Sequence, residues 1–536
     1  MERLALPPFE NLTADPSLDW ISAAAPAILA VEITGALKTV PVRVTAARDA
    51  FAARATEICY GRFSRFGTEL RVDVVVQDLA RTKTVATLAA EGPLADGILP
   101  LASAIARRLD RRAHALGTSS QDAVEQWGRA LQATNPAERI AAFQKSVADD
   151  PNFGAAYVGW TQALLTAGDR AAAEAALTKA HARGTLLDDI SRAQLELIAA
   201  NLHGDMNGRR EALVELSRLT QHDADAVRAL AQEELQARHF AVAADLLRKA
   251  VTLDPGDAVL LNSFGYAQAY ARDLPGAMKT FSEYGREAGQ QANAFDSLGE
   301  ANFYAGHFGD AERYFLKAHT ANAALLGGGD LLKAAGARLM TGDIAAADGL
   351  FHQYEDFRRR FHDPNLGIES ARWEYLTGRR DQAIKDLALL SGSGPGVQRQ
   401  LCVWYLQSGD VSRAAACHDP AAPATKLQAA AALLLNKRFA DAVPLFQQLY
   451  QQTNPAVDGQ IRTLYAWALI ETGRVKDAQE QDLVELYPIP GFSGDPMFAS
   501  LMFPRFLHLR SVVRDYQGHR EEAAQCQKLY TQLGGR

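Results

Sequence analysis

The chain has 536 residues, of which 48% are hydrophobic, and this composition excludes a disordered protein. Its formal net charge of −7 excludes a nucleic-acid binder that relies on bulk positive charge. The 4 cysteines lie far apart and form no CxxC pair, which argues against a disulfide framework and against a zinc site.

The first residues, MERLALPPFENL, do not form an export signal, because Pro7, Pro8 and Glu10 interrupt any apolar core. The sequence shows no run of about 18 apolar residues, so we expect no helix that spans a membrane. The chain opens directly on an expected strand. We therefore expect a cytoplasmic protein as written, or a periplasmic or membrane-anchored one if an upstream segment is missing.

The first part of the chain, residues 1–117, predicts a small α/β sandwich. Short alternating or apolar runs bounded by turn residues indicate strands, and apolar residues at helical spacing indicate helices. Asp19 is expected to cap the first helix. Val72, Val74 and Val76 are expected on one face of the central hairpin, with Asp73, Val75 and Gln77 on the other. The expected strands are 4–6, 40–44, 57–66, 69–79 and 84–90, and the expected helices are 20–37 and 98–113.

The opening LPPFENLTADPSLDWISAAAPAILAVEITG resembles the TolB amino-terminal-like domain, which is often fused to tetratricopeptide arrays in bacteria. The sequence Phe9-Glu10-Asn11-Leu12, the pair Asp15-Pro16 and Trp20 match its pattern. The resemblance implies an accessory or assembly domain and not a catalyst. The stretch before the central hairpin, residues 46–56, is shorter than is usual in that family. Two interpretations of Phe9 and Asn11 remain open: a partner-binding loop, or a strand anchor with a turn cap.

The stretch ANAFDSLGEANFYAGHFGDAERYFLKA, residues 292–318, predicts two packed helices that turn at Gly306. Gly299 and Ala311 allow a close approach, and Phe308 and Phe315 fill the remaining space. The same pattern recurs with a period of about 34 residues, so residues 118–536 resemble a tetratricopeptide array of about eleven hairpins. We therefore predict a mainly α protein, a tetratricopeptide-type α-α superhelical solenoid preceded by the α/β sandwich.

Three stretches interrupt the repeats. Gly327 to Gly329 is expected to be a flexible joint, and SGSGPG at 391–396 a linker or loose loop. Residues 487–506 form an insertion with prolines and aromatics, similar to a loop in bacterial kinase-associated tetratricopeptide proteins. It is either a cap on the last core or a docking surface. No Gly-rich loop, HRD or DFG sequence accompanies it.

No catalytic motif is present in the sequence. There is no GxSxG, P-loop, GxGxxG or HExxH pattern, and the 12 histidines are scattered. We therefore predict no enzyme, no metal and no cofactor.

The inner face of the solenoid is the expected binding site, because first helices line the groove in tetratricopeptide arrays. We predict a protein or peptide partner there, neither nucleic acid nor a membrane span, and leave the partner's identity and the oligomeric state open. The alternative is a regulatory or sensory part of a bacterial signalling system, kinase- or transcription-associated, whose effector domain lies elsewhere. The expected groove residues are Arg228, Asn262, Tyr266, Tyr270, Glu300, Phe303, Tyr304, Arg372 and Tyr375, with Gln232 and Asp296 beside them.

Overall fold

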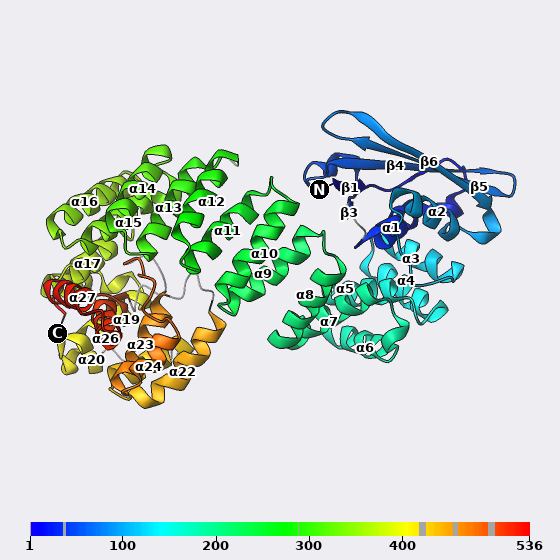
Figure 1. Cartoon of the computed structure of the whole chain (residues 1–536). Helices are drawn as coiled ribbons and strands as arrows, with labels where there is room; N and C mark the ends of the chain where they lie inside the picture. The colour runs from blue at the N-terminus through cyan, green and yellow to red at the C-terminus, as the bar shows by residue number, and fades with distance from the viewer. Residues whose placement is uncertain are drawn as a thin grey trace. The chain divides into compact units, whose positions relative to one another are not determined.

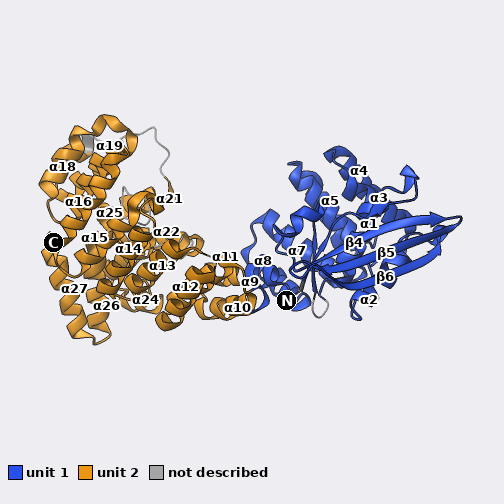
Figure 2. Cartoon of the chain, turned by 90° about the horizontal axis from the view of Figure 1, so that it is seen from above, with its two compact units in different colours: residues 1–230, 252–254 blue, residues 231–251, 255–536 orange. Residues whose placement is uncertain are grey.

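The structure is a computed structural model that describes residues 2–35, 39–287, 289–416, 425–453, 459–490 and 499–535. The chain divides into two compact units, coloured separately in Figure 2. Unit 1 comprises residues 1–230 and 252–254, and unit 2 comprises residues 231–251 and 255–536.

Unit 1 begins with a mixed sheet whose strand order is β3-β1-β4-β5-β6, with β2 paired to β4. The pairs β1–β3 and β1–β4 are parallel, and the hairpins β4–β5 and β5–β6 are antiparallel. This confirms the small α/β domain. Its strands are β1 (Glu2–Leu6), β2 (Glu10–Asn11), β3 (Thr39–Arg43), β4 (Glu57–Phe66), β5 (Glu69–Asp78) and β6 (Lys83–Pro93).

Two helices, α1 (Ile21–Ile33) and α2 (Leu99–Leu109), pack on one face of this sheet. Val72, Val74 and Val76 face them and are at most 3% exposed, as the alternation predicted. By length and mean hydropathy the window from Pro16 to Ile33 is apolar enough to cross a bilayer, contrary to the expectation from the sequence. In the structure 56% of that window is buried, and α1 is a core helix.

The loop before α1 is held by its own side chains. The Asn11 amide nitrogen donates to the Asp19 carboxylate at 2.6 Å, and the Asn11 side-chain oxygen accepts from the Thr13 amide at 2.8 Å. Asp19 therefore does not cap α1, whose N-cap is Trp20 without a side-chain bond, so that prediction was wrong. Phe9 is only 3% exposed, which supports its interpretation as a strand anchor.

Helical hairpins follow the sheet in unit 1 and share its core. An added Cβ on Gly128 would lie 2.8 Å from Ala24 on α1 and equally close to the Trp20 ring, so the first hairpin packs directly on the α/β layer. The helices are α3 (Gln121–Gln132), α4 (Pro136–Asp149), α5 (Gly154–Thr166), α6 (Arg170–His181), α7 (Asp189–His203) and α8 (Met206–Leu219), and α9 (Ala224–Gln236) crosses the unit boundary.

Unit 2 continues as α-α hairpins that form a tetratricopeptide-like solenoid (Figure 1). Most hairpins turn at a glycine with positive φ, such as Gly306 at +85° and Gly342 at +83°. The helices are α10 (Phe240–Leu253), α11 (Ala258–Tyr270), α12 (Leu274–Glu287), α13 (Gln291–Tyr304), α14 (Phe308–Ala321), α15 (Gly329–Met340), α16 (Ile344–Arg360), α17 (Leu366–Leu376), α18 (Arg380–Leu389), α19 (Pro395–Ser408), α20 (Val411–Ala416), α21 (Lys426–Leu435), α22 (Phe439–Gln452), α23 (Gly459–Glu471), α24 (Val475–Glu480), α25 (Ala499–Met502), α26 (Arg505–Tyr516) and α27 (Arg520–Gln532).

In two consecutive hairpins a glycine on the first helix receives an aromatic ring from the second. An added Cβ on Gly299 of α13 would lie 2.5 Å from the Phe315 ring of α14. Gly265 and Phe281 repeat this arrangement at the same distance one hairpin earlier. The packing predicted for residues 292–318 is therefore present, and Ala311 is fully buried beside it.

The expected flexible joint and loose loop are ordered turns in the structure. Leu325–Gly328 is a 3-10 turn in which the Arg358 guanidinium donates to the Gly327 carbonyl at 3.1 Å. Ser391–Ser393 is a second 3-10 turn, and α19 begins at Pro395 directly after it. Both stretches are short connections between consecutive helices and not linkers.

The end of the chain folds back onto earlier hairpins of unit 2. The C-terminal hairpin α26–α27, red in Figure 1, lies beside α17. An added Cβ on Gly378, in the turn after α17, would lie 3.6 Å from the Leu533 backbone. The segment before α25 is buried too, because Tyr487 and Ile489 are only 8% and 4% exposed. The described part of the insertion is therefore core, while residues 491–498 lie outside the described residues.

Candidate functional site

A buried lysine joins two consecutive first helices of the solenoid. Lys333 on α15 donates to Asp296 at 2.7 Å and to Glu300 at 2.6 Å, both on α13. Only 2% of its side chain is exposed. Burial alone would lower the pKa of Lys333, but the carboxylates of Glu300 and Asp296 raise it on balance. Lys333 is therefore a cation that ties α13 to α15.

Asp330, one turn before Lys333, adds a third carboxyl to this cluster. It has no exposed surface. Burial first, and then the negative charge of Asp296, raise the pKa of Asp330 to about 8. The pKa of Asp296 is also raised, by burial and by Glu300. The raised pKa favours the protonated form of Asp330, which reduces the repulsion among three carboxyls around one lysine.

Tyrosines from α11 and α13 surround this cluster. The hydroxyls of Tyr266 and Tyr304 donate to the same Glu300 oxygen at 2.9 and 3.3 Å. The Tyr270 ring lies about midway, 6.1 Å from Tyr266 and 6.0 Å from Tyr304. Burial, followed by the charge of Glu300, raises the pKa of Tyr266 and of Tyr304. Asn262 joins them, because its side-chain oxygen accepts from the Ser297 hydroxyl at 3.3 Å. The structure thus gathers these predicted groove residues: Asn262, Tyr266, Tyr270, Glu300 and Tyr304.

The chain's own C-terminal part covers one end of this inner face. The backbone amide of Tyr487 donates to the Tyr304 carbonyl at 3.2 Å, and its ring packs 5.0 Å from the Phe308 ring. An added Cβ on Gly336 of α15 would lie 3.5 Å from the Pro490 ring. Residues 487–490 therefore occupy a stretch of the inner face where a partner was expected to bind.

Two of the predicted groove residues are packed side chains. Phe303 has no exposed surface and lies 5.2 Å from the Phe308 ring, so it is a core residue. Tyr375 is 3% exposed and stacks on Trp404 with ring centroids 4.2 Å apart. Its hydroxyl donates to Gln407 at 3.1 Å. Both rings are therefore packed against other side chains of unit 2.

Arg372 and Arg228 do not join the tyrosine cluster. Arg372 on α17 donates to Gln400 and Glu369, each at 3.0 Å, and is about one quarter exposed. Arg228 belongs to unit 1, where it forms an ion pair with Asp225 at 3.0 Å. The predicted set therefore separates into a buried cluster, single residues on α17 and a residue of the other unit.

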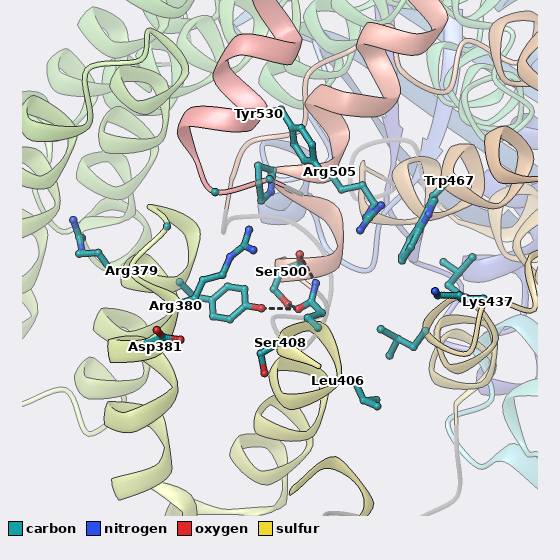
Figure 3. Close-up of a pocket in the computed structure, with 18 of the residues that line it drawn as sticks. Arg379, Arg380, Asp381, Leu406, Ser408, Lys437, Trp467, Ser500, Arg505 and Tyr530 are labelled. Carbon is teal, nitrogen blue, oxygen red and sulfur yellow. Dashed lines mark hydrogen bonds between the residues drawn. The ribbon is translucent and has the colours of Figure 1, made fainter. Parts of the chain in front are cut away.

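A cavity of about 780 Å³ opens at the hairpin-turn edge of unit 2 (Figure 3). The ends of α17, α19, α21 and α23 border it, and α26 and the end of α27 close the remaining side. On its floor Tyr375 meets Gln407, which also accepts from the Ser500 hydroxyl at 2.8 Å. The charged residues that line it are Arg379, Arg380, Asp381, Lys437, Glu471 and Arg505. We call this space the edge cavity.

Apart from Tyr375, these cavity residues were not among the predicted site residues. The pair Arg379-Arg380 follows Gly378 at a turn, which the sequence does show. Arg505 lies more than a hundred residues later, and only the folding back of α26 brings it to that turn. Within the described residues no group of His, Cys, Asp and Glu could hold a metal ion.

One segment of the solenoid matches a known protein family. Residues 433–481, which include α22, α23 and α24, match the tetratricopeptide repeat family. The chain carries a tetratricopeptide repeat. A comparison with curated proteins found no match. The resemblance of residues 1–117 to TolB amino-terminal-like domains stays a prediction.

Several solved structures are also similar to parts of the chain. YrrB, described as having an unusual peptide-binding site, shares 19% identity over 34% of this chain and 94% of its own, with a TM-score of 0.30. The C-terminal part of a repeat protein from Cytophaga hutchinsonii shares 14% identity over 42% of this chain and 89% of its own, with a TM-score of 0.34. PilF from Pseudomonas aeruginosa shares 16% identity over 36% of this chain and 87% of its own, with a TM-score of 0.28.

Proposed function

We propose that this chain is a non-catalytic scaffold that holds a protein partner at the edge cavity of unit 2. The observation that carries the proposal is the cavity itself, about 780 Å³ in volume and bordered by successive hairpins. Aromatic and arginine side chains line it, and these residue types contribute most of the binding energy when a partner covers them. The groove predicted on α13 is partly filled by residues 487–490, so the edge cavity is the better candidate.

The tetratricopeptide repeat of residues 433–481 supports the same proposal, because stacked helical hairpins present extended surfaces for other proteins. The alternative derived from the sequence, a regulatory part of a signalling system, gains no support from the described residues and is not favoured.

Photocrosslinking in the source cells tests the proposal. A benzoylphenylalanine at Leu406, which lines the cavity and is 42% exposed, is expected to form a discrete crosslinked product. Benzoylphenylalanine in place of Leu389 is the matched control, because Leu389 is 84% exposed and lies outside the cavity lining. This control is expected to give no crosslinked product. Equal crosslinking at both positions, or none at Leu406, would refute the edge cavity as the partner site.

A further inference from the structure

The edge cavity carries positive charge that the described residues do not neutralise. Arg379 pairs with Asp348 at 2.7 Å and is thereby satisfied. Arg380 and Arg505 form no ion pair with any described carboxylate, and the buried Nε of Arg380 has no hydrogen-bond acceptor there. Both residues are half-buried, and two half-buried guanidinium groups without a described carboxylate partner at one cavity favour a site that an anion completes.

Both guanidinium groups are held against aromatic rings. Arg505 lies 3.9 Å from the centre of the Trp467 ring, and Arg380 lies 5.5 Å from that of Tyr375. Figure 3 shows Arg380 and Arg505 directed into the space between them, whereas Arg379 points away. A ring contact fixes the plane of a guanidinium, and the terminal N–H groups at the rim of that plane are donors that bind a carboxylate.

The surroundings of Arg505 support this interpretation. Burial lowers the pKa of Arg505, Tyr530 and Glu471 oppose this shift, and the charge of Arg380 adds a smaller lowering. An anion bound between the two arginines would favour their charged forms and so oppose this lowering. The arrangement is therefore costly when empty and favourable when an anion is present.

The carboxylates that line the cavity do not fill this role. Asp381 is exposed in the first turn of α18, where the helix dipole stabilises a negative charge. Glu471 is also exposed and accepts from the Trp467 indole nitrogen at 3.2 Å. Lys437 at the exposed end of α21 adds a further cation. The cavity thus keeps an excess of positive charge beside the paired arginines.

The volume of the edge cavity and its apolar lining favour a peptide over a small ion as the ligand. Leu406, Leu435 and Phe439 form an apolar side of the cavity, and Leu406 is 42% exposed. A phosphate-sized ion would contact the arginines and leave most of about 780 Å³ to water. A peptide places a carboxylate between the arginines and an apolar side chain against Leu406 and Phe439.

We propose that the edge cavity binds an acidic peptide segment of a protein partner, whose carboxylate is held jointly by Arg380 and Arg505. This inference rests on the proposed scaffold function and adds the chemistry that selects the partner. The carboxylate belongs to a glutamate, an aspartate or a chain terminus, and the apolar neighbour in the peptide contacts Leu406.

Selection from a random library of displayed peptides of about twelve residues tests this inference on the full chain. The wild-type chain is expected to enrich peptides that share an acidic residue or a free terminal carboxylate next to an apolar residue. The Arg380→Gln/Arg505→Gln variant is expected to bind the enriched peptides at least about tenfold more weakly, since it lacks both charge-assisted bonds.

Two further variants make the result specific. Arg313→Gln/Arg359→Gln removes the same charge from exposed i,i+3 ion pairs of unit 2 and is expected to bind as the wild type does. Arg380→Lys/Arg505→Lys keeps the charge but not the forked geometry and is expected to recover part of the affinity. Thermal unfolding midpoints verify that all variants are folded.

The outcomes separate the inference from the scaffold proposal. Enrichment without acidic residues, or equal binding by the Arg380→Gln/Arg505→Gln variant, overturns the acidic peptide while the crosslinking result at Leu406 still stands. Thermal stabilisation by inorganic phosphate that depends on both arginines, together with no acidic enrichment, assigns the site to a small anion and also overturns it. Failure of crosslinking at Leu406 overturns the scaffold proposal itself.

Discussion

Lys333 shows how a charged residue can be placed in the interior of a helical solenoid. Its ammonium group lies within 2.7 Å of two carboxylates on the preceding first helix, and two tyrosine hydroxyls donate to one of these carboxylates. Removing one partner from such a cluster usually costs roughly 3–5 kcal/mol, because the remaining charge stays buried. The cluster therefore specifies the register of α13 against α15 more than it adds net stability.

The pH dependence of stability is expected to reveal Asp330. Its pKa is about 8 in the folded chain against 3.8 for an ordinary aspartate, so the folded state binds more protons than the unfolded state between these values. Stability contributed by this group is therefore full at low pH and decreases as the pH rises from about 4 to 8. Asp330→Asn, a neutral side chain of the same shape, is expected to gain stability relative to the wild type between pH 5 and pH 8.

Urea unfolding at several pH values measures this difference, with Asp356→Asn as the control. Asp356 is 63% exposed in an ion pair with Arg359, so its substitution is expected to change stability little and without this trend. If the difference in the free energy of unfolding between Asp330→Asn and the wild type stayed constant with pH, a raised pKa at Asp330 would be contradicted.

Position 299 is expected to require glycine, because the Phe315 ring leaves no space for a Cβ there. An added Cβ would lie 2.5 Å from the Phe315 ring in a buried contact between α13 and α14. Gly299→Ala is therefore expected to lower the free energy of unfolding by about 1–3 kcal/mol, although alanine favours helix. Chemical denaturation measures the change.

Gly349, in the middle of α16, is the matched control. No atom lies within 4 Å of its added Cβ, so Gly349→Ala is expected to stabilise the chain by up to about 1 kcal/mol. If Gly299→Ala and Gly349→Ala changed the free energy of unfolding equally, helix propensity alone would explain both changes. The contact with the Phe315 ring would then not be the reason for glycine at position 299.

At the scale of the element, the segment 483–490 behaves as part of the core although it contains no helix. Leu483 and Val484 are fully buried, and Arg510 on α26 donates to the carbonyls of Val484 and Glu485. Arg514 forms a further ion pair with Glu485 at 2.7 Å. These bonds satisfy backbone groups that would otherwise be buried without a partner, which is why an irregular segment is stable there.

Tyr487 is expected to hold this segment on α13. It is 8% exposed and its ring contacts Phe308 and Phe506. Tyr487→Ala is therefore expected to cost about 3 kcal/mol or more and to speed hydrogen exchange at the backbone amide of residue 487. Tyr516→Ala, at a residue that is 56% exposed, is expected to change stability by less than about 0.5 kcal/mol. Rapid exchange at residue 487 already in the wild type would contradict the docked segment.

Most elements could be predicted from the sequence, because their signals are local. The glycine turn at Gly306 and the alternation of Val72 to Val76 predicted a hairpin and strands close to their observed bounds. What the sequence could not predict is where distant elements meet. Tyr304 was a reasonable groove residue by its helical face, but only the fold shows that residue 487 binds its carbonyl. The presence of Arg380 and Arg505 in one cavity depends on the same return of the chain.

At the scale of the whole molecule, each unit has an extended core of its own. In unit 1 the core joins the sheet to the first hairpins, and Phe63 is fully buried in it. In unit 2 one large core extends from Phe303 to Leu533, because the C-terminal hairpin returns to the solenoid. Repeat proteins without such a return are stabilised mainly by neighbouring hairpins. Closure by α26 and α27 instead links hairpins that are distant in the chain.

This organisation predicts two cooperative unfolding transitions, one for each unit. Phe63→Ala and Trp404→Ala each remove a fully buried ring, so each is expected to destabilise its own unit by about 3–5 kcal/mol. Differential scanning calorimetry is expected to show the first variant lowering one transition temperature and the second lowering the other. Hydrogen exchange assigns each transition, since Trp404→Ala should weaken protection in α26 as well as α19. A single transition that both variants lower equally would instead mean that the two cores unfold as one.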